Sequence, residues 1–84
     1  MDRQWWDHPL MLATKRLGRV VRINSTEHAA GFLLNEWPTE KTGQAYEWAK
    51  QALLDAVEGR ITTEAARSAM IAAAREDGVF VYGE

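Results

Sequence analysis

Two alanine-patterned segments on either side of Gly59 constrain the fold more than any other feature of the sequence. Each segment repeats small or apolar side chains three and four residues apart, which places them on one face of a helix. Faces built from alanine allow two helix backbones to approach closely. The link Gly59-Arg60-Ile61 is short, and Gly59 stands where a left-handed helix cap is expected. The sequence therefore predicts an antiparallel helical hairpin.

The first helix of this hairpin is expected over about 44–58, and the second begins at a capping Thr62 and runs to about Asp77. The repeating residues are Ala45, Ala49, Ala52, Leu53, Ala56 and Val57 in the first, and Ala66, Ala69, Met70 and Ala73 in the second.

A third helix is predicted before the hairpin. Asn24-Ser25-Thr26-Glu27 supplies a capping side chain and then an acid in the first turn, where the helix dipole favours negative charge. Pro38 disfavours helical backbone at the residue before it and ends the helix. A connector over 39–43 then leads to Gln44. The apolar face of this helix consists of Ala30, Leu33, Leu34 and Trp37.

Short apolar runs at both ends of the chain predict strands. Residues 9–14 and 19–23 flank Lys15-Arg16-Leu17-Gly18, a loop of hairpin length whose glycine supports a positive φ. The first run is apolar throughout 10–13, which favours a central strand covered on both faces. Arg19 and Arg22 interrupt the second run, which favours an edge strand. Val79-Phe80-Val81-Tyr82 predicts a third strand.

These elements give the order β-β-α-α-α-β and an α+β fold class. If successive elements alternate in direction, the last strand lies antiparallel beside the first. We therefore expect one small domain over residues 1–84, with a three-stranded antiparallel sheet of order 2-1-3 packed on one face by three helices.

The composition argues against a catalytic or metal-binding site. The 84 residues include no cysteine, two histidines without ligand spacing, and no glycine-rich phosphate loop. Ser25 is already assigned to a helix cap, and Ser68 lies on an alanine-rich helix, so neither has the surroundings of a nucleophile. A domain of this size also has little room for an enclosed active site. We expect no catalytic residue, no cofactor and no metal, and hence a protein that is not an enzyme.

The chain also has no apolar run of the roughly 20 residues needed to cross a bilayer, and its first residues lack the apolar run of a signal peptide. We expect a cytoplasmic protein that does not bind a membrane.

Several segments together resemble a known family. They are Trp6 and Pro9, then Trp37-Pro38 and Gly43, then residues 56–59, 64–70 and 73–81. This pattern, most specific over 59–81, resembles that of short alphaproteobacterial proteins grouped as domain-of-unknown-function family 982. Members often have cysteine where this chain has Ala52, and phenylalanine where it has Met70. The family has no assigned activity, so the resemblance implies a single compact domain and no site residue.

Charge is unevenly distributed between the two ends of the chain. Residues 1–23 hold five bases and two acids, a net charge of +3, whereas residues 24–84 hold five bases and ten acids, a net of −5. A basic hairpin is one way to track phosphates, and tryptophans can stack on unpaired bases. The same split is also explained by a solvated hairpin beside acidic helices. The bases concerned are Lys15, Arg16, Arg19 and Arg22.

Four tryptophans in 84 residues are many for a small domain. Trp37 and Trp48 fit apolar helical positions and are expected in the core. Trp5 and Trp6 are adjacent, so in an extended chain at least one of them faces outward. Two explanations stay open: an aromatic contact for a partner, or Trp6 in the core with Trp5 half exposed. Arg67 is expected either to pair with Glu64 along its helix or to reach a partner's carboxylate.

The function expected from these features is a small non-catalytic interaction or regulatory protein that acts through protein–protein contacts, with a homodimer as one form of such contacts. The alternative is weak nucleic-acid binding through the basic N-terminal hairpin. The candidate contact residues are Trp5, Trp6, Lys15, Arg16, Arg19, Arg22 and Arg67.

Overall fold

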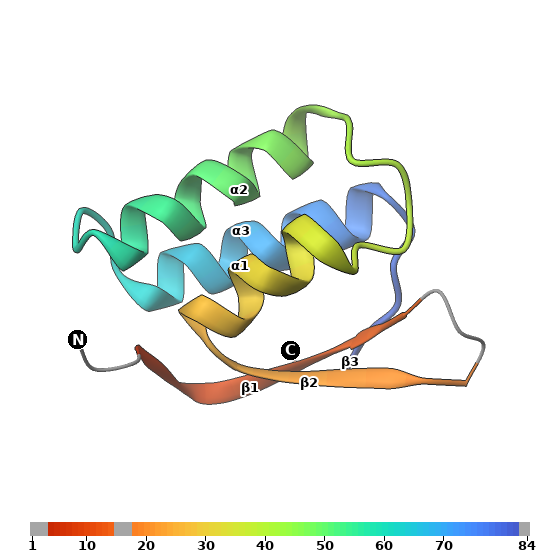
Figure 1. The fold of residues 1–84 in the computed structure, drawn as a ribbon, viewed down its shortest axis with the longest axis horizontal. Helices are drawn as coiled ribbons and strands as arrows, with labels where there is room; N and C mark the ends of the chain where they lie inside the picture. Colours follow the sequence, from red (N-terminus) through yellow and green to blue (C-terminus); the bar gives the residue numbers. More distant parts are fainter. Residues whose placement is uncertain (1–3, 15–17, 83–84) are drawn as a thin grey trace.

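The computed structural model describes residues 4–14 and 18–82 and confirms the predicted order of elements (Figure 1). The elements are β1 (Trp5–Ala13), β2 (Val20–Ser25), α1 (Thr26–Asn35), α2 (Gln44–Val57), α3 (Thr63–Glu76) and β3 (Val81–Tyr82). β1 begins earlier than predicted and β3 has only two of its four expected residues. α1 ends two residues before Trp37.

The sheet has the predicted antiparallel order β2-β1-β3. Met11 lies at its centre, opposite Arg22 on β2 and Tyr82 on β3. The register between β1 and β2 shifts between Trp5 and Leu10. At the hairpin, the backbone N–H of Thr14 donates to the carbonyl oxygen of Arg19 at 3.0 Å, and Gly18 adopts the predicted positive φ, at 80°.

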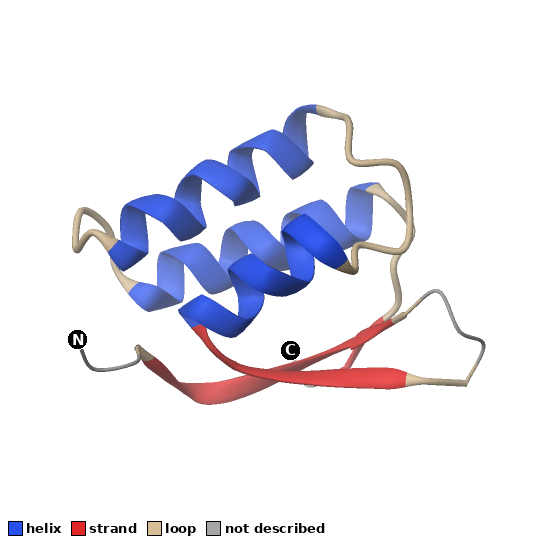
Figure 2. Ribbon diagram, in the orientation of Figure 1, coloured by secondary structure: helices blue, strands red, loops and turns tan. Residues whose placement is uncertain are grey.

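All three helices lie on one side of the sheet, in two tiers (Figures 1 and 2). α1 and α3 rest on the strands, and α2 packs on α1 and α3 at the greatest distance from the sheet. α2 and α3 form the predicted antiparallel hairpin, with Gly59 at a φ of 80° in the link between them. No helix within the described ranges is both long and apolar enough to span a bilayer.

The prediction that the first strand is covered on both faces is wrong. Leu10 and Leu12 are fully buried beneath the helices, but Met11 between them is 37% exposed. Successive strand residues point to opposite faces, and no described helix covers the second face. An apolar run in this strand therefore marks one buried face and one apolar face that remains open.

Buried aromatic side chains form the centre of the core, and each has a hydrogen bond for its polar atom. Trp6 Nε1 donates to Thr26 Oγ1 at 3.1 Å, and the Tyr46 hydroxyl donates to the carbonyl oxygen of Leu33 at 2.9 Å. Trp37 Nε1 donates to Asp77 Oδ2 at 2.9 Å. Because a buried donor without a partner is costly, these bonds fix the position of each ring as well as its burial.

Trp37 ties three parts of the chain together. Its side chain is completely buried, and its ring meets that of Phe32 edge-on at 6.0 Å and that of Tyr46 at 5.9 Å. Its indole N–H reaches Asp77 at the end of α3, where the same carboxylate oxygen accepts from Thr39 Oγ1 at 3.3 Å. The connector after α1 is thus fastened to both helices of the hairpin.

Leu34 departs from its predicted place on the apolar face of α1. It is 44% exposed and, with Leu54, lines a small depression of about 70 Å³ between α1 and α2.

Replacing Asp77 with alanine should lower the free energy of unfolding by about 1–3 kcal/mol, because the buried Trp37 indole N–H loses its acceptor. Urea denaturation followed by circular dichroism measures this loss. Glu76→Ala changes an exposed neighbouring acid and serves as the control. An Asp77→Ala effect that stays equally large in a Trp37→Phe background would contradict the pairing.

Burial, reinforced by the charge of Glu47, raises the pKa of Tyr46 above its ordinary value near 10. The unfolded chain therefore loses this proton first as pH rises through 10, and the fold loses stability between that pH and the raised pKa. Below pH 9, Tyr46→Phe should cost about 1 kcal/mol through the lost hydrogen bond. That deficit should shrink above pH 10 in urea denaturation; a deficit constant with pH would refute the shift. Tyr82→Phe is the control at an exposed tyrosine.

Candidate interaction surfaces

The two adjacent tryptophans separate into one core residue and one surface residue. Trp6 is 7% exposed and donates to Thr26, whereas Trp5 is 63% exposed. The second of the two explanations left open by the sequence accounts for Trp6, because its ring completes the core. Among the two, only Trp5 keeps the exposure that a contact residue requires.

The basic hairpin is described only in part. Arg19 and Arg22 are exposed, and Arg22 lies on the open face of the sheet opposite Met11. Lys15 and Arg16 lie outside the described residues.

Arg67 contacts the N-terminal part of β1. Its Nε donates to the carbonyl oxygen of His8 at 2.8 Å, a bond that ties α3 to the strand. Arg67, His8, Asp7 and Glu64 also line a polar depression of about 140 Å³. No group of three or more histidine, aspartate or glutamate side chains within 4–14 and 18–82 is placed to hold a metal ion.

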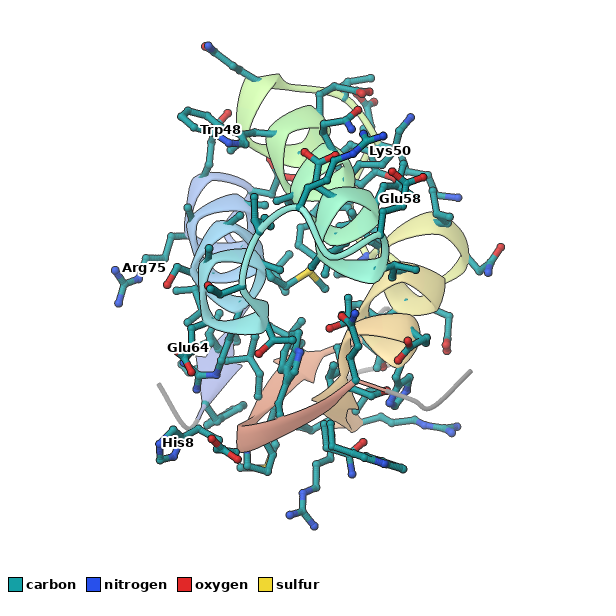
Figure 3. All side chains as sticks on the ribbon, turned by 90° about the vertical axis from the view of Figure 1, so that its left-hand side faces the viewer. His8, Trp48, Lys50, Glu58, Glu64 and Arg75 are labelled. Atoms are coloured by element: carbon teal, nitrogen blue, oxygen red, sulfur yellow. The ribbon has the colours of Figure 1, made fainter. Side chains whose placement is uncertain are left out.

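The prediction that Trp48 lies in the core is wrong. Its side chain is 70% exposed and extends from α2 on the side where α3 lies, away from α1 (Figure 3). It forms one wall of a groove of about 510 Å³ between the two helices, which we call the α2–α3 groove. The groove is lined by Ala45, Trp48, Ala52, Ile61, Ala65, Ser68, Ala69 and Ala72.

The sequence pattern around Trp48 is compatible with either orientation. Ala45 and Ala52 lie three and four residues from Trp48, and they flank Ala49 at the same spacings. In the structure Tyr46, Ala49 and Leu53 face the core, so Trp48 falls on the groove side. A helix with alanine on two faces does not reveal from spacing alone which face is covered.

A second apolar surface lies on the sheet face away from the helices, and sequence reasoning missed its aromatic residues. We call it the outer sheet face. Its exposed members are Met11, Val20, Arg22, Phe80 and Tyr82. Phe80 is 66% and Tyr82 44% exposed, and their rings stack at 5.1 Å. The alternation of valine and aromatic residues over 79–82 could have predicted that Phe80 and Tyr82 share one face of the strand, and in the structure Val79 is buried and Phe80 is exposed.

Charge is divided between the two sides of the molecule. Among the described residues every acid except Asp7 belongs to the helices, their connections or their caps, in residues 26–78. Arg19 and Arg22 stand on the hairpin, and Arg19 lines a depression of about 270 Å³ together with Phe80 and Tyr82. The acidic net charge of the chain therefore resides on the helical side.

Comparison with known proteins gave a match to a protein family. The model of a family described as "Protein of unknown function (DUF982)" covers residues 8–81 of the 84. No curated protein and no solved structure gave a significant match.

Acrylamide should quench the tryptophan fluorescence of a dilute solution in two phases. Trp5 and Trp48 are 63% and 70% exposed, whereas Trp6 and Trp37 are at most 7% exposed. The double variant Trp5→Phe/Trp48→Phe should lose the readily quenched phase and keep the shielded one. A readily quenched phase that survives in this variant would contradict the placement of these rings.

Proposed function

This chain belongs to the DUF982 family, and we propose that it acts as a small non-catalytic interaction protein that forms a homodimer through the α2–α3 groove. One observation carries the proposal: a large aromatic side chain, Trp48, stands 70% exposed at the edge of an alanine-lined groove on the same helix pair. Exposed tryptophans beside apolar hollows are typical of the residues that dominate protein interfaces.

A second copy fits this surface because the projecting ring and the hollow lie side by side. A two-fold dimer requires one patch that is complementary to itself. A rotation of 180° about an axis parallel to α2 and α3 lays α2 of the second copy over α3 of the first. Gly43 lies beside Glu76, and five residues along each antiparallel helix bring Trp48 to the level of Ile71 and the adjoining Ala72, which lines the groove. The indole of each copy would then pack on Ala69 and Ala72 of the other.

The size of the surface sets the expected strength. Each helix has 14 residues, so at a rise of 1.5 Å per residue the pair offers a footprint of about 20 by 20 Å. Such a footprint, about 400 Å² per copy, is below the range of stable specific interfaces, which favours a weak and reversible dimer over a permanent one.

Sedimentation velocity from micromolar to millimolar concentration should therefore show a monomer–dimer equilibrium. Trp48→Ala should raise the dimer Kd by more than about tenfold, because truncation of a central aromatic typically costs about 2 kcal/mol or more. Ala72→Glu places a charge on an exposed alanine of the groove and should abolish the dimer while circular dichroism shows an unchanged fold.

Trp5→Ala is the matched control, because Trp5 is 63% exposed but lies outside the groove. It should leave the Kd unchanged. A protein that stays monomeric throughout the concentration range, or equal effects of the two tryptophan variants, would refute the proposal.

A further inference from the structure

The outer sheet face carries aromatic rings and arginine side chains that the proposed homodimer does not use. Arg22, Met11 and Tyr82 form one row across β2, β1 and β3, and all three are exposed. Val20 and Ala13 form the next row, which Phe80 continues through the hydrogen bond from the Ala13 N–H to its carbonyl oxygen at 3.0 Å. Rings therefore stand along one edge of this face, and positive charge along the other.

The two rings form a flat aromatic step. Phe80 and Tyr82 stack at a centroid distance of 5.1 Å with 30° between their planes. Phe80 remains 66% exposed although it contacts Tyr82. A planar, solvent-facing aromatic surface is what an unpaired base requires for stacking, and stacking of this kind tolerates any base.

Positive charge lies within reach of the rings. Arg19 lines the same depression, of about 270 Å³, as Phe80 and Tyr82. Arg22 lies two strand spacings from Tyr82, about 10 Å across the sheet. The guanidinium group matches phosphate geometry, and the described strands contain one acid, Asp7, at the other end of β1.

We infer that the outer sheet face binds single-stranded nucleic acid, with bases stacked on Phe80 and Tyr82 and phosphates held by Arg19 and Arg22. This inference goes beyond the proposed homodimer and rests on a different surface. A duplex offers no free base faces to these rings. A purely apolar partner gains nothing from arginines beside them, and an acidic protein gains nothing from the stacking geometry.

The size of the site predicts weak binding with a shallow salt dependence. Each phosphate neutralised on a single strand contributes a slope of about −0.7 in log K against log salt, so two arginines give about −1.4. A steeper slope would require cations beyond these two.

The test uses fluorescein-labelled single-stranded DNA and RNA oligonucleotides of mixed sequence, with fluorescence anisotropy measured at low salt. The full chain should bind both single strands, and a hairpin duplex of the same length should bind more weakly. The double variant Phe80→Leu/Tyr82→Leu should weaken binding about tenfold, because leucine keeps the apolar character but removes the stacking surface. Arg19→Gln/Arg22→Gln should weaken binding and flatten the salt slope.

Two matched controls separate this site from the rest of the molecule. Trp48→Ala removes an exposed aromatic ring from the α2–α3 groove, and Arg60→Gln removes an exposed arginine that pairs with Asp55 and Glu58. Both variants should bind the oligonucleotides as the parent chain does, even where Trp48→Ala changes the association state. The two proposals therefore fail independently.

Three results would overturn the inference. One is the absence of binding to either single strand at low salt. Another is binding that the leucine variant retains in full, since an apolar contact without stacking behaves in this way. The third is equal affinity for the duplex, which indicates phosphate attraction alone. Circular dichroism of each variant shows whether the exposed substitutions leave the fold intact. If stacking is the cause, Tyr82→Phe, which keeps the aromatic ring, should retain the binding of the parent chain.

Discussion

The hydrogen bond from the Trp37 indole to Asp77 is the contact on which the helical layer depends. It holds the connector after α1 against the end of α3, while the ring itself packs on Phe32 and Tyr46. Without it the largest buried side chain would carry an unpaired donor into the core. The position of α2 above α1 and α3 follows, since α2 begins only a few residues after this anchored connector.

Because the helices occupy one side of the sheet only, the fold leaves two apolar surfaces that its own core does not use. The α2–α3 groove faces away from α1, and the outer sheet face lies beneath the strands. The first surface is lined mainly by alanines beside Trp48, and the second carries Arg22. A small domain buries a limited share of its apolar surface, and here apolar side chains stay exposed in these two regions as well as at Trp5, Leu34 and Leu54. Because the two regions are separate, the proposed homodimer and the proposed nucleic-acid site do not compete for the same residues.

The sequence predicted the architecture better than the surfaces, and the reasons differ by element. Strand order followed from chain direction and from the edge character of a strand containing Arg22, and helix ends followed from Ser25, Thr62 and Gly59, whose effects are local. Trp48 was assigned to the wrong face, because α2 has alanine on two faces and only packing against α1 selects between them. The alternation in the last strand indicates that Phe80 and Tyr82 share one face. Whether the helices cover that face depends on the position of the helices, which the strand sequence does not reveal.

The pairing of β1 with β3 has a consequence for how the sheet is assembled. Met11 pairs with Tyr82, so two residues separated by almost the whole chain must meet before the central strand has both neighbours. Closure of so long a loop is entropically costly and slow compared with formation of the hairpin or of the helices. Until β3 pairs with it, β1 therefore keeps one strand edge unpaired, and an unpaired strand edge is open to pairing with other chains.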